Sequence, residues 1–90
     1  NNKSYINLAE MAVPEEFKKS HKLKKLNIKF NKETFLCDVL NCSTYRTEMP
    51  YIYTHIIKKD GVSVCDIVTE WEKSDFNESI VEYPLKVKSE

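Results

Sequence analysis

Residues 51–68 read YIYTHIIKKDGVSVCDIV, and this stretch decides the fold class. Two β-rich runs flank Asp60-Gly61, a dipeptide typical of the two-residue turn of a β-hairpin. Such a turn needs positive φ, which glycine adopts without a steric penalty. The strands on either side have partly apolar faces, so we expect them to be central in a sheet or covered on both sides.

The register of this hairpin bears on a candidate catalytic cluster. With Asp60-Gly61 at the turn centre, His55 faces Asp66, and Cys65 points to the opposite sheet face. A cysteine nucleophile needs its thiol within hydrogen-bond reach of an imidazole. We therefore interpret His55 and Asp66 as a cross-strand polar pair and expect no catalytic residues. The other facing pairs in this register are Ile57 with Val64 and Tyr53 with Val68.

A second hairpin is predicted upstream. Apolar and polar residues alternate on both sides of a four-residue turn at residues 31–34. Pairing Phe30 with Phe35 brings the apolar side chains of both strands to one face. These side chains belong to Leu26, Ile28, Phe30, Phe35, Cys37 and Val39. Residues 41–50 are polar and irregular, and we interpret them as a loop.

Helical patterns occupy both ends of the chain. A first helix is predicted over residues 4–13, where apolar residues recur at helical spacing. Pro14 followed by two acidic residues is typical of a second helix start, and this helix is expected to end near Ser20 or His21. After Trp71, Asp75-x-x-Glu78 has capping-box spacing and favours a short C-terminal helix. The stripe of the first helix consists of Tyr5, Leu8, Ala9 and Ala12.

Together these elements predict a single α+β domain over residues 1–90. It has an N-terminal helical segment, a four-stranded antiparallel meander and a short C-terminal helix. A chain of 90 residues buries only about 60% of its unfolded surface, which excludes two domains. The chain opens on Asn1-Asn2 without a methionine, so we expect a domain excised from a larger protein.

The composition excludes several kinds of site. One glycine, Gly61, cannot build the glycine-rich loops that cradle phosphates, so no nucleotide cofactor is expected. Structural zinc usually takes two pairs of closely spaced ligands, whereas Cys37 and Cys42 form the one close pair. No apolar run approaches the roughly 18 residues of a membrane span. We predict no metal, cofactor, membrane contact or small-molecule substrate, and no enzymatic activity.

The net charge of zero hides two opposed segments. Residues 1–32 carry eight lysines against three glutamates, and residues 60–90 carry three lysines against eight acidic residues. The sequence leaves open whether these segments meet in the monomer. The basic one suggests an alternative function, a nucleic-acid-binding module that combines lysines with exposed aromatics. Its residues would be Lys18, Lys19, Lys22, Lys24, Lys25, Lys29, Tyr51 and Tyr53.

The leading hypothesis from sequence is a non-enzymatic protein–protein interaction module. It would dock another protein, or a second copy of itself, through a sheet edge and a C-terminal aromatic patch. The patch comprises Trp71, Phe76, Ile80 and Tyr83.

The cysteines and glycosylation motifs indicate two different locations. Three cysteines cannot all pair in disulfides, which favours reduced thiols and an intracellular location. Three N-x-Ser triplets, at Asn2, Asn41 and Asn77, are glycosylation sequons and favour a secreted, glycosylated binding domain as a further alternative.

Overall fold

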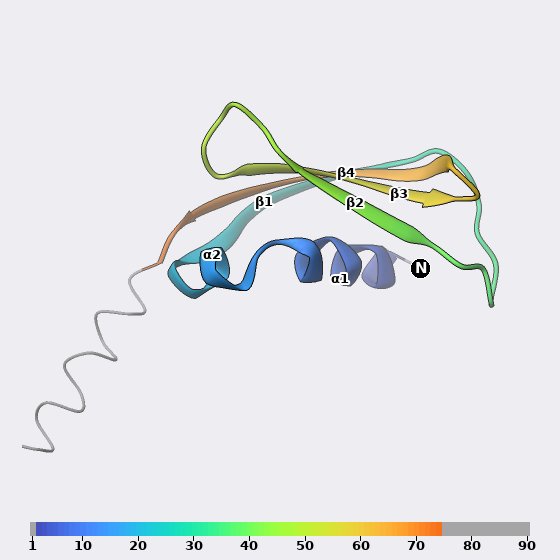
Figure 1. Cartoon of the computed structure of the whole chain (residues 1–90), viewed down its shortest axis with the longest axis horizontal. Helices are drawn as coiled ribbons and strands as arrows, with labels where there is room; N and C mark the ends of the chain where they lie inside the picture. The colour runs from blue at the N-terminus through green and yellow to red at the C-terminus, as the bar shows by residue number, and fades with distance from the viewer. Residues whose placement is uncertain (1, 75–90) are drawn as a thin grey trace, which may run out of the picture.

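A computed structural model describes residues 2–74 (Figure 1). Helices α1 (Asn2–Ala12) and α2 (Glu15–Ser20) precede four strands, and both helices lie along one face of the sheet. The sheet is antiparallel, with the strand order β1-β4-β3-β2. This confirms the predicted α+β class. The predicted C-terminal helix lies outside the described residues. The strands are β1 (His21–Phe30), β2 (Asn41–Arg46), β3 (Ile52–Lys59) and β4 (Val62–Lys73).

Helix α1 packs on the sheet through the apolar stripe that the sequence predicts. Tyr5 and Ala9 are buried, but Ala12 is exposed and Val13 is buried in its place. Val13 follows Ala9 by four residues and so continues the same face. Pro14 disfavours helical backbone at the residue before it, which separates α1 from α2. Within the described residues, no helix has the length and apolar character needed to cross a membrane.

The turn between β3 and β4 is the one that the sequence predicts. Asp60 and Gly61 have φ values of 52° and 80°, the pair of positive values that defines a type I′ turn. Such a turn matches the twist of the flanking strands, which is why two residues suffice to reverse the chain.

Replacing Gly61 by alanine should destabilise the domain by about 1 kcal/mol. A Cβ at this position meets no atom within 4 Å, so the loss would come from the positive φ of 80° and not from a clash. Denaturant unfolding of the wild-type and Gly61→Ala chains measures it. Gly61→Asn is the control, since asparagine tolerates left-handed backbone and should lose less. Equal stability of all three chains would contradict this account.

The register of β3 with β4 differs from the prediction by one residue. A β-bulge lies between Ile57 and Lys58, so that Ile57 pairs with Cys65 and His55 pairs with Ile67. A shift of one residue moves every β4 side chain to the other sheet face. Alternate β4 residues from Cys65 onward therefore face the helices and are buried, namely Cys65, Ile67, Thr69 and Trp71.

The predicted first hairpin is wrong. Residues 31–40 form a loop, and β1 pairs with β4 instead, with Phe30 opposite Cys65. The backbone amides of Asn31 and Lys32 donate hydrogen bonds to the carbonyl oxygen of Val64, at 2.9 and 3.2 Å, which leads the chain away from a tight turn. Residues 41–46, predicted to be a loop, form β2 on β3. The alternation upstream of residue 31 therefore marks a real strand with a distant partner.

Two groups of buried side chains fill the space between the helices and the sheet. The first lies under α1 and the second under α2. The first group contains Tyr5, Ala9, Ile57, Val64, Cys65 and Ile67, with Leu8, Leu26, Ile28, Leu40 and Cys42 partly buried around it. The second contains Val13, Tyr53 and Trp71, flanked by Phe17 and Leu23.

The basic and acidic segments meet across the β1–β4 pair. Lys22 lies 3.8 Å from Glu72, and Lys24 lies 3.7 Å from Glu70, between side-chain nitrogen and carboxylate oxygen. All four side chains are more than a third exposed, and such ion pairs contribute about 0–1 kcal/mol each. The pairs therefore neutralise charge on this surface more than they stabilise the sheet.

Candidate functional site

A buried histidine lies at the centre of a polar chain that crosses three strands. His55 on β3 is fully buried. Its Nδ1 lies 2.9 Å from Oγ1 of Thr44 on β2, and its Nε2 lies 2.8 Å from Oγ1 of Thr69 on β4. Trp71 Nε1 donates to the same Thr69 oxygen at 2.9 Å, and Cys42 Sγ lies 3.8 Å from Thr44 Oγ1. Both ring nitrogens of His55 are thus hydrogen-bonded inside the core.

The hydrogen-bond partners assign the tautomer of His55. Trp71 Nε1 can only donate, so the Thr69 oxygen accepts from it. Within the described residues, Nε2 of His55 is the partner that remains for the hydrogen of the Thr69 hydroxyl, so Thr69 donates to it. Nδ1 of the neutral ring then carries the hydrogen and donates to Thr44. The Thr44 hydroxyl is in turn free to donate to Cys42. In this arrangement the hydrogens of Trp71 Nε1, the two threonine hydroxyls and His55 Nδ1 each have an acceptor.

Burial keeps His55 neutral. Loss of water around the ring lowers the pKa of His55 from 6.5 to about 4. The lone pair of the neutral ring, on Nε2, accepts the hydrogen of the Thr69 hydroxyl and is not available to a substrate. His55 therefore serves as a structural link between β2, β3 and β4, and not as a base open to a substrate.

The predicted pair of His55 with Asp66 is wrong. The bulge after Ile57 places Asp66 on the sheet face away from His55, where its carboxylate accepts from Asn31 and Ser63, both at 2.9 Å. These hydrogen bonds, Asn31 first, lower the pKa of Asp66. Cys65 instead shares the His55 face, where burial raises the pKa of its thiol. A thiol of raised pKa is a poor nucleophile.

The other histidine, His21, is also not placed to act as a base on a neighbouring nucleophile. Nδ1 of His21 lies 2.9 Å from both the Phe17 carbonyl oxygen and Ser20 Oγ. The carbonyl can only accept, so Nδ1 carries the hydrogen and cannot activate the serine. Nε2 is buried and has no hydrogen-bond partner among the described residues. The ring stacks on Phe17 at 3.9 Å and lies 5.1 Å from Tyr51, which makes it part of an aromatic cluster.

Of the four predicted partner-binding residues, Trp71 is the one that lies within the described residues. Trp71 is 5% exposed, and its ring meets that of Phe17 edge-on at 5.9 Å. It packs in the second core group and not on the surface. Phe76, Ile80 and Tyr83 lie outside the described residues.

The residues of the nucleic-acid alternative do not share one surface. Tyr53 is buried beneath α2, and Tyr51 packs against Phe17 at 6.4 Å on the helix side. Most of the lysines are exposed, and several pair with acidic side chains. Lys18 and Lys19 pair with Glu15 and Glu16, and Lys22 and Lys24 pair with Glu72 and Glu70.

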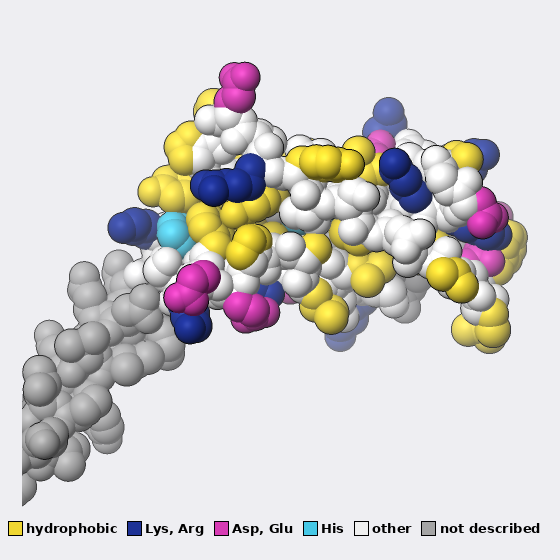
Figure 2. All heavy atoms as spheres, viewed as in Figure 1, with side chains coloured by type: hydrophobic (Ala, Val, Ile, Leu, Met, Phe, Trp, Pro, Cys, Tyr) yellow, Lys and Arg dark blue, Asp and Glu magenta, His cyan; other side chains and the backbone are white. Residues whose placement is uncertain are grey.

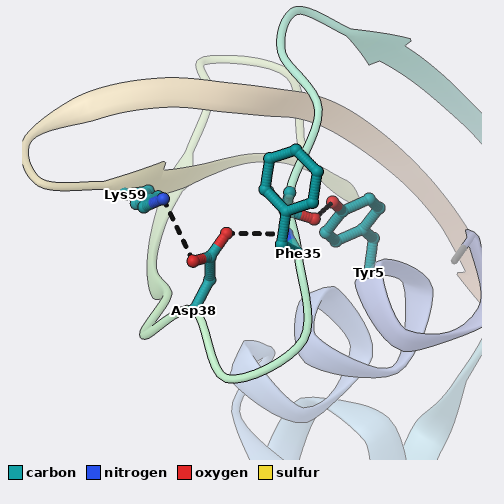
Figure 3. A network of polar contacts seen from close by, with 5 residues as sticks. Tyr5, Phe35, Asp38 and Lys59 are labelled. Atoms are coloured by element: carbon teal, nitrogen blue, oxygen red, sulfur yellow. Dashed lines mark hydrogen bonds and ion pairs between the residues drawn. The ribbon is translucent and has the colours of Figure 1, made fainter.

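The loop of residues 31–40 is held by side-chain contacts at both ends (Figure 3). The Tyr5 hydroxyl on α1 hydrogen-bonds Thr34 Oγ1. The Asp38 carboxylate accepts from the Phe35 amide at 2.7 Å and from Lys59 Nζ at 3.0 Å. The Phe35 hydrogen bond, followed by Lys59, lowers the pKa of Asp38. The loop therefore has a defined conformation at the end of the sheet where β3 turns into β4.

Replacing Asp38 by alanine should accelerate amide hydrogen exchange at Phe35 by roughly tenfold or more. The variant removes the carboxylate that accepts from this amide. Exchange measured residue by residue tests the prediction, and Lys59→Met is the matched control. That variant removes the ion pair but keeps the acceptor, so a smaller acceleration is expected. An unchanged Phe35 rate in Asp38→Ala would contradict the role assigned to Asp38.

The fold and its buried polar core define an α+β domain in which two helices cover one face of an antiparallel sheet. A family model for the acyl-ACP thioesterase C-terminal domain matches residues 1–73. The chain belongs to this family of acyl-ACP thioesterase C-terminal domains.

A solved structure supports the fold assignment. The 12:0-ACP thioesterase from Umbellularia californica superposes with a TM-score of 0.71 at 23% sequence identity. The match covers 82% of this chain and 29% of that one, so this chain spans less than a third of the length of that thioesterase. At this identity the likeness establishes the fold. No curated protein matches the chain.

The family assignment corrects the functional prediction from sequence. The non-enzymatic interaction module, and with it the expectation of no enzymatic activity, is wrong, because the matching family is one of thioester-hydrolysing enzymes. Thr44 is a residue of the polar chain that the sequence did not predict, because residues 41–50 were interpreted as a loop. Thr44 and Tyr45 are residue types enriched in strands, and this is the signal that could have found it.

Proposed function

We propose that this domain is part of an acyl-ACP thioesterase, which hydrolyses the thioester between an acyl chain and its carrier protein. The observation that carries the proposal is the family match over residues 1–73, which includes every described helix and strand. In this reaction water adds to the thioester carbonyl and the carbon–sulfur bond breaks. A carboxylic acid and the free thiol of the carrier are released.

We assign the hydrolysis to an intact enzyme and not to the described residues alone. Within residues 2–74, His55 bonds two threonines and His21 bonds a backbone carbonyl, so neither histidine activates a nucleophile. In this proposal the described residues supply a structural part of the enzyme, namely the sheet and the loop of residues 31–40.

Purified protein from the native source tests the proposal with dodecanoyl-ACP as substrate. A thiol reagent should report release of the carrier thiol, and mass spectrometry in ¹⁸O-water should show one labelled oxygen in the fatty acid. The label shows that the acyl group is transferred to water and not to another acceptor. Heat-inactivated protein is the control. No thiol release above this control, with medium-chain or long-chain acyl-ACP, would refute the proposal.

The proposal also names the partner. The sequence prediction of a protein partner agrees with a carrier-bound substrate, since the carrier is itself a protein. The expectation that the domain takes no small-molecule substrate has no support, because the bond to be cleaved belongs to an acyl thioester.

We also propose an intracellular location, in line with the expectation from sequence. Cys37, Cys42 and Cys65 all carry free thiols in the structure, which is typical of a reducing compartment. Thiol titration and mass measurement of the native protein test this proposal. A glycan on Asn2 or Asn41 would favour the secreted alternative.

A further inference from the structure

The loop of residues 31–40 exposes three large apolar side chains. Phe35 is 66% exposed, Leu36 is 94% exposed and Val39 is 78% exposed. Figure 2 shows hydrophobic side chains at the tip of this loop, at the right-hand end of the molecule. Isolated apolar residues are common on protein surfaces, but several in one short loop mark an interaction site.

The loop is ordered by its own contacts, so its exposed side chains do not result from a loose chain. Asp38 binds the Phe35 amide and Lys59, and its own amide donates to the Phe35 carbonyl at 3.0 Å. Tyr5 binds the loop through Thr34. A loop held in one conformation loses less entropy when a partner covers it.

The loop lies beside the beginning of α1. Tyr5 is in the first turns of this helix, contacts Thr34 through its hydroxyl and places its ring 5.9 Å from that of Phe30. Figure 1 shows the start of α1 at the same end of the molecule as the loop. In a family member with further residues before α1, those residues would reach the domain next to this apolar surface.

We infer that Phe35, Leu36 and Val39 form a docking surface for the portion of an acyl-ACP thioesterase that lies outside the C-terminal domain. The family comprises the C-terminal domains of acyl-ACP thioesterases. The structural match covers 29% of the thioesterase from Umbellularia californica, so most of that enzyme lies outside the matched domain and could act as the partner. The charged residues between positions 33 and 39 are Glu33 and Asp38, and Asp38 is already paired with Lys59. The surface therefore suits an apolar partner. The inference rests on family membership and not on the proposed hydrolysis.

Cys37 at the tip of this loop is a natural probe of the docking. It is exposed in the domain, next to Leu36. The experiment measures the rate at which iodoacetamide alkylates Cys37 in the whole protein purified from its native source. The reference rate is that of a synthetic peptide of residues 33–40. A covered loop should slow the reaction at least about tenfold relative to the peptide.

Two variants of the whole protein separate docking from loop structure. Leu36→Glu should return the Cys37 rate to near that of the peptide, because the charge disrupts an apolar interface while Asp38 and Tyr5 still hold the loop. Met11→Glu is the matched control, since Met11 is 74% exposed on α1, and protection should persist.

Three outcomes would overturn the inference. In the first, Cys37 of the native protein reacts at the peptide rate, or the native protein extends no further than this domain. In the second, protection survives Leu36→Glu, which would assign it to the loop itself. In the third, protection disappears on dilution, which would identify the partner as a second copy. Protection without thioester hydrolysis would retain this inference and refute the proposed function.

Discussion

Replacing Trp71 by alanine should cost about 3–5 kcal/mol of unfolding free energy. The side chain is 5% exposed, packs with Val13 and Tyr53, and donates a hydrogen bond to Thr69. Alanine would leave a cavity beneath α2 and remove one donor from the His55 chain. Because a domain of this size is stabilised by only several kcal/mol, the variant should be largely unfolded.

Circular dichroism and denaturant unfolding measure this effect, with two controls. Trp71→Phe keeps an aromatic ring beside Phe17 but removes the hydrogen bond to Thr69. The lost hydrogen bond should lower the unfolding free energy by about 1 kcal/mol, in addition to the effect of the smaller ring. Val68→Ala changes a neighbouring β4 side chain on the outer face and should have a small effect. A folded Trp71→Ala chain with an unchanged midpoint would contradict the place of Trp71 in the core.

The domain should lose about 2–3 kcal/mol of stability when the pH falls from 7 to 4.5, because of His55 alone. Burial lowers the pKa of this ring to about 4 in the folded chain, against 6.5 for an ordinary histidine. Between these values the unfolded chain binds a proton that the folded chain does not. Stability therefore rises with pH through this window, and the contribution is lost as the pH falls from about 6.5 to 4.

Urea unfolding at several pH values between 4.5 and 7 tests the prediction. His55→Gln should flatten the pH dependence, although it lowers stability at pH 7. Hydrogen bonds lower the pKa values of Asp38 and Asp66, so their stabilising effects are lost only at pH values below this range. An identical slope in the wild-type and His55→Gln chains would show that His55 does not titrate as the structure implies.

Local sequence patterns predicted where the helices and most strands lie better than which strands pair with each other. Asp60-Gly61 specifies its turn through backbone geometry within two residues, and the prediction was right. The alternation in β1 also marked a strand, but its partner is β4, some forty residues later in the chain. No local signal carries that information. The predicted pairing of Phe30 with Phe35 is wrong because an alternating pattern marks a strand but does not identify its partner.

The same limit applied to the buried polar core. A bulge after Ile57 is not evident from residue types, yet it shifts the register by one residue. That shift exchanges Asp66 for Ile67 as the β4 residue opposite His55 and brings Thr69 to the same sheet face as His55. The predicted cross-strand polar pair is thereby replaced by a buried hydrogen-bond chain. The residue types of the chain also did not indicate an enzyme, because both described histidines have structural roles and offer no catalytic pattern. The family model supplied that assignment.

The position of β4 has a consequence for how the protein is made. β4 lies between β1 and β3 in the sheet, although it is the last of the described strands to be synthesised. While residues 62–73 are still in the ribosome, β1 has no neighbour and its apolar face is open to solvent. The sheet can close only after Lys73 emerges, so a stalled or truncated nascent chain would expose an unpaired strand for chaperones to bind.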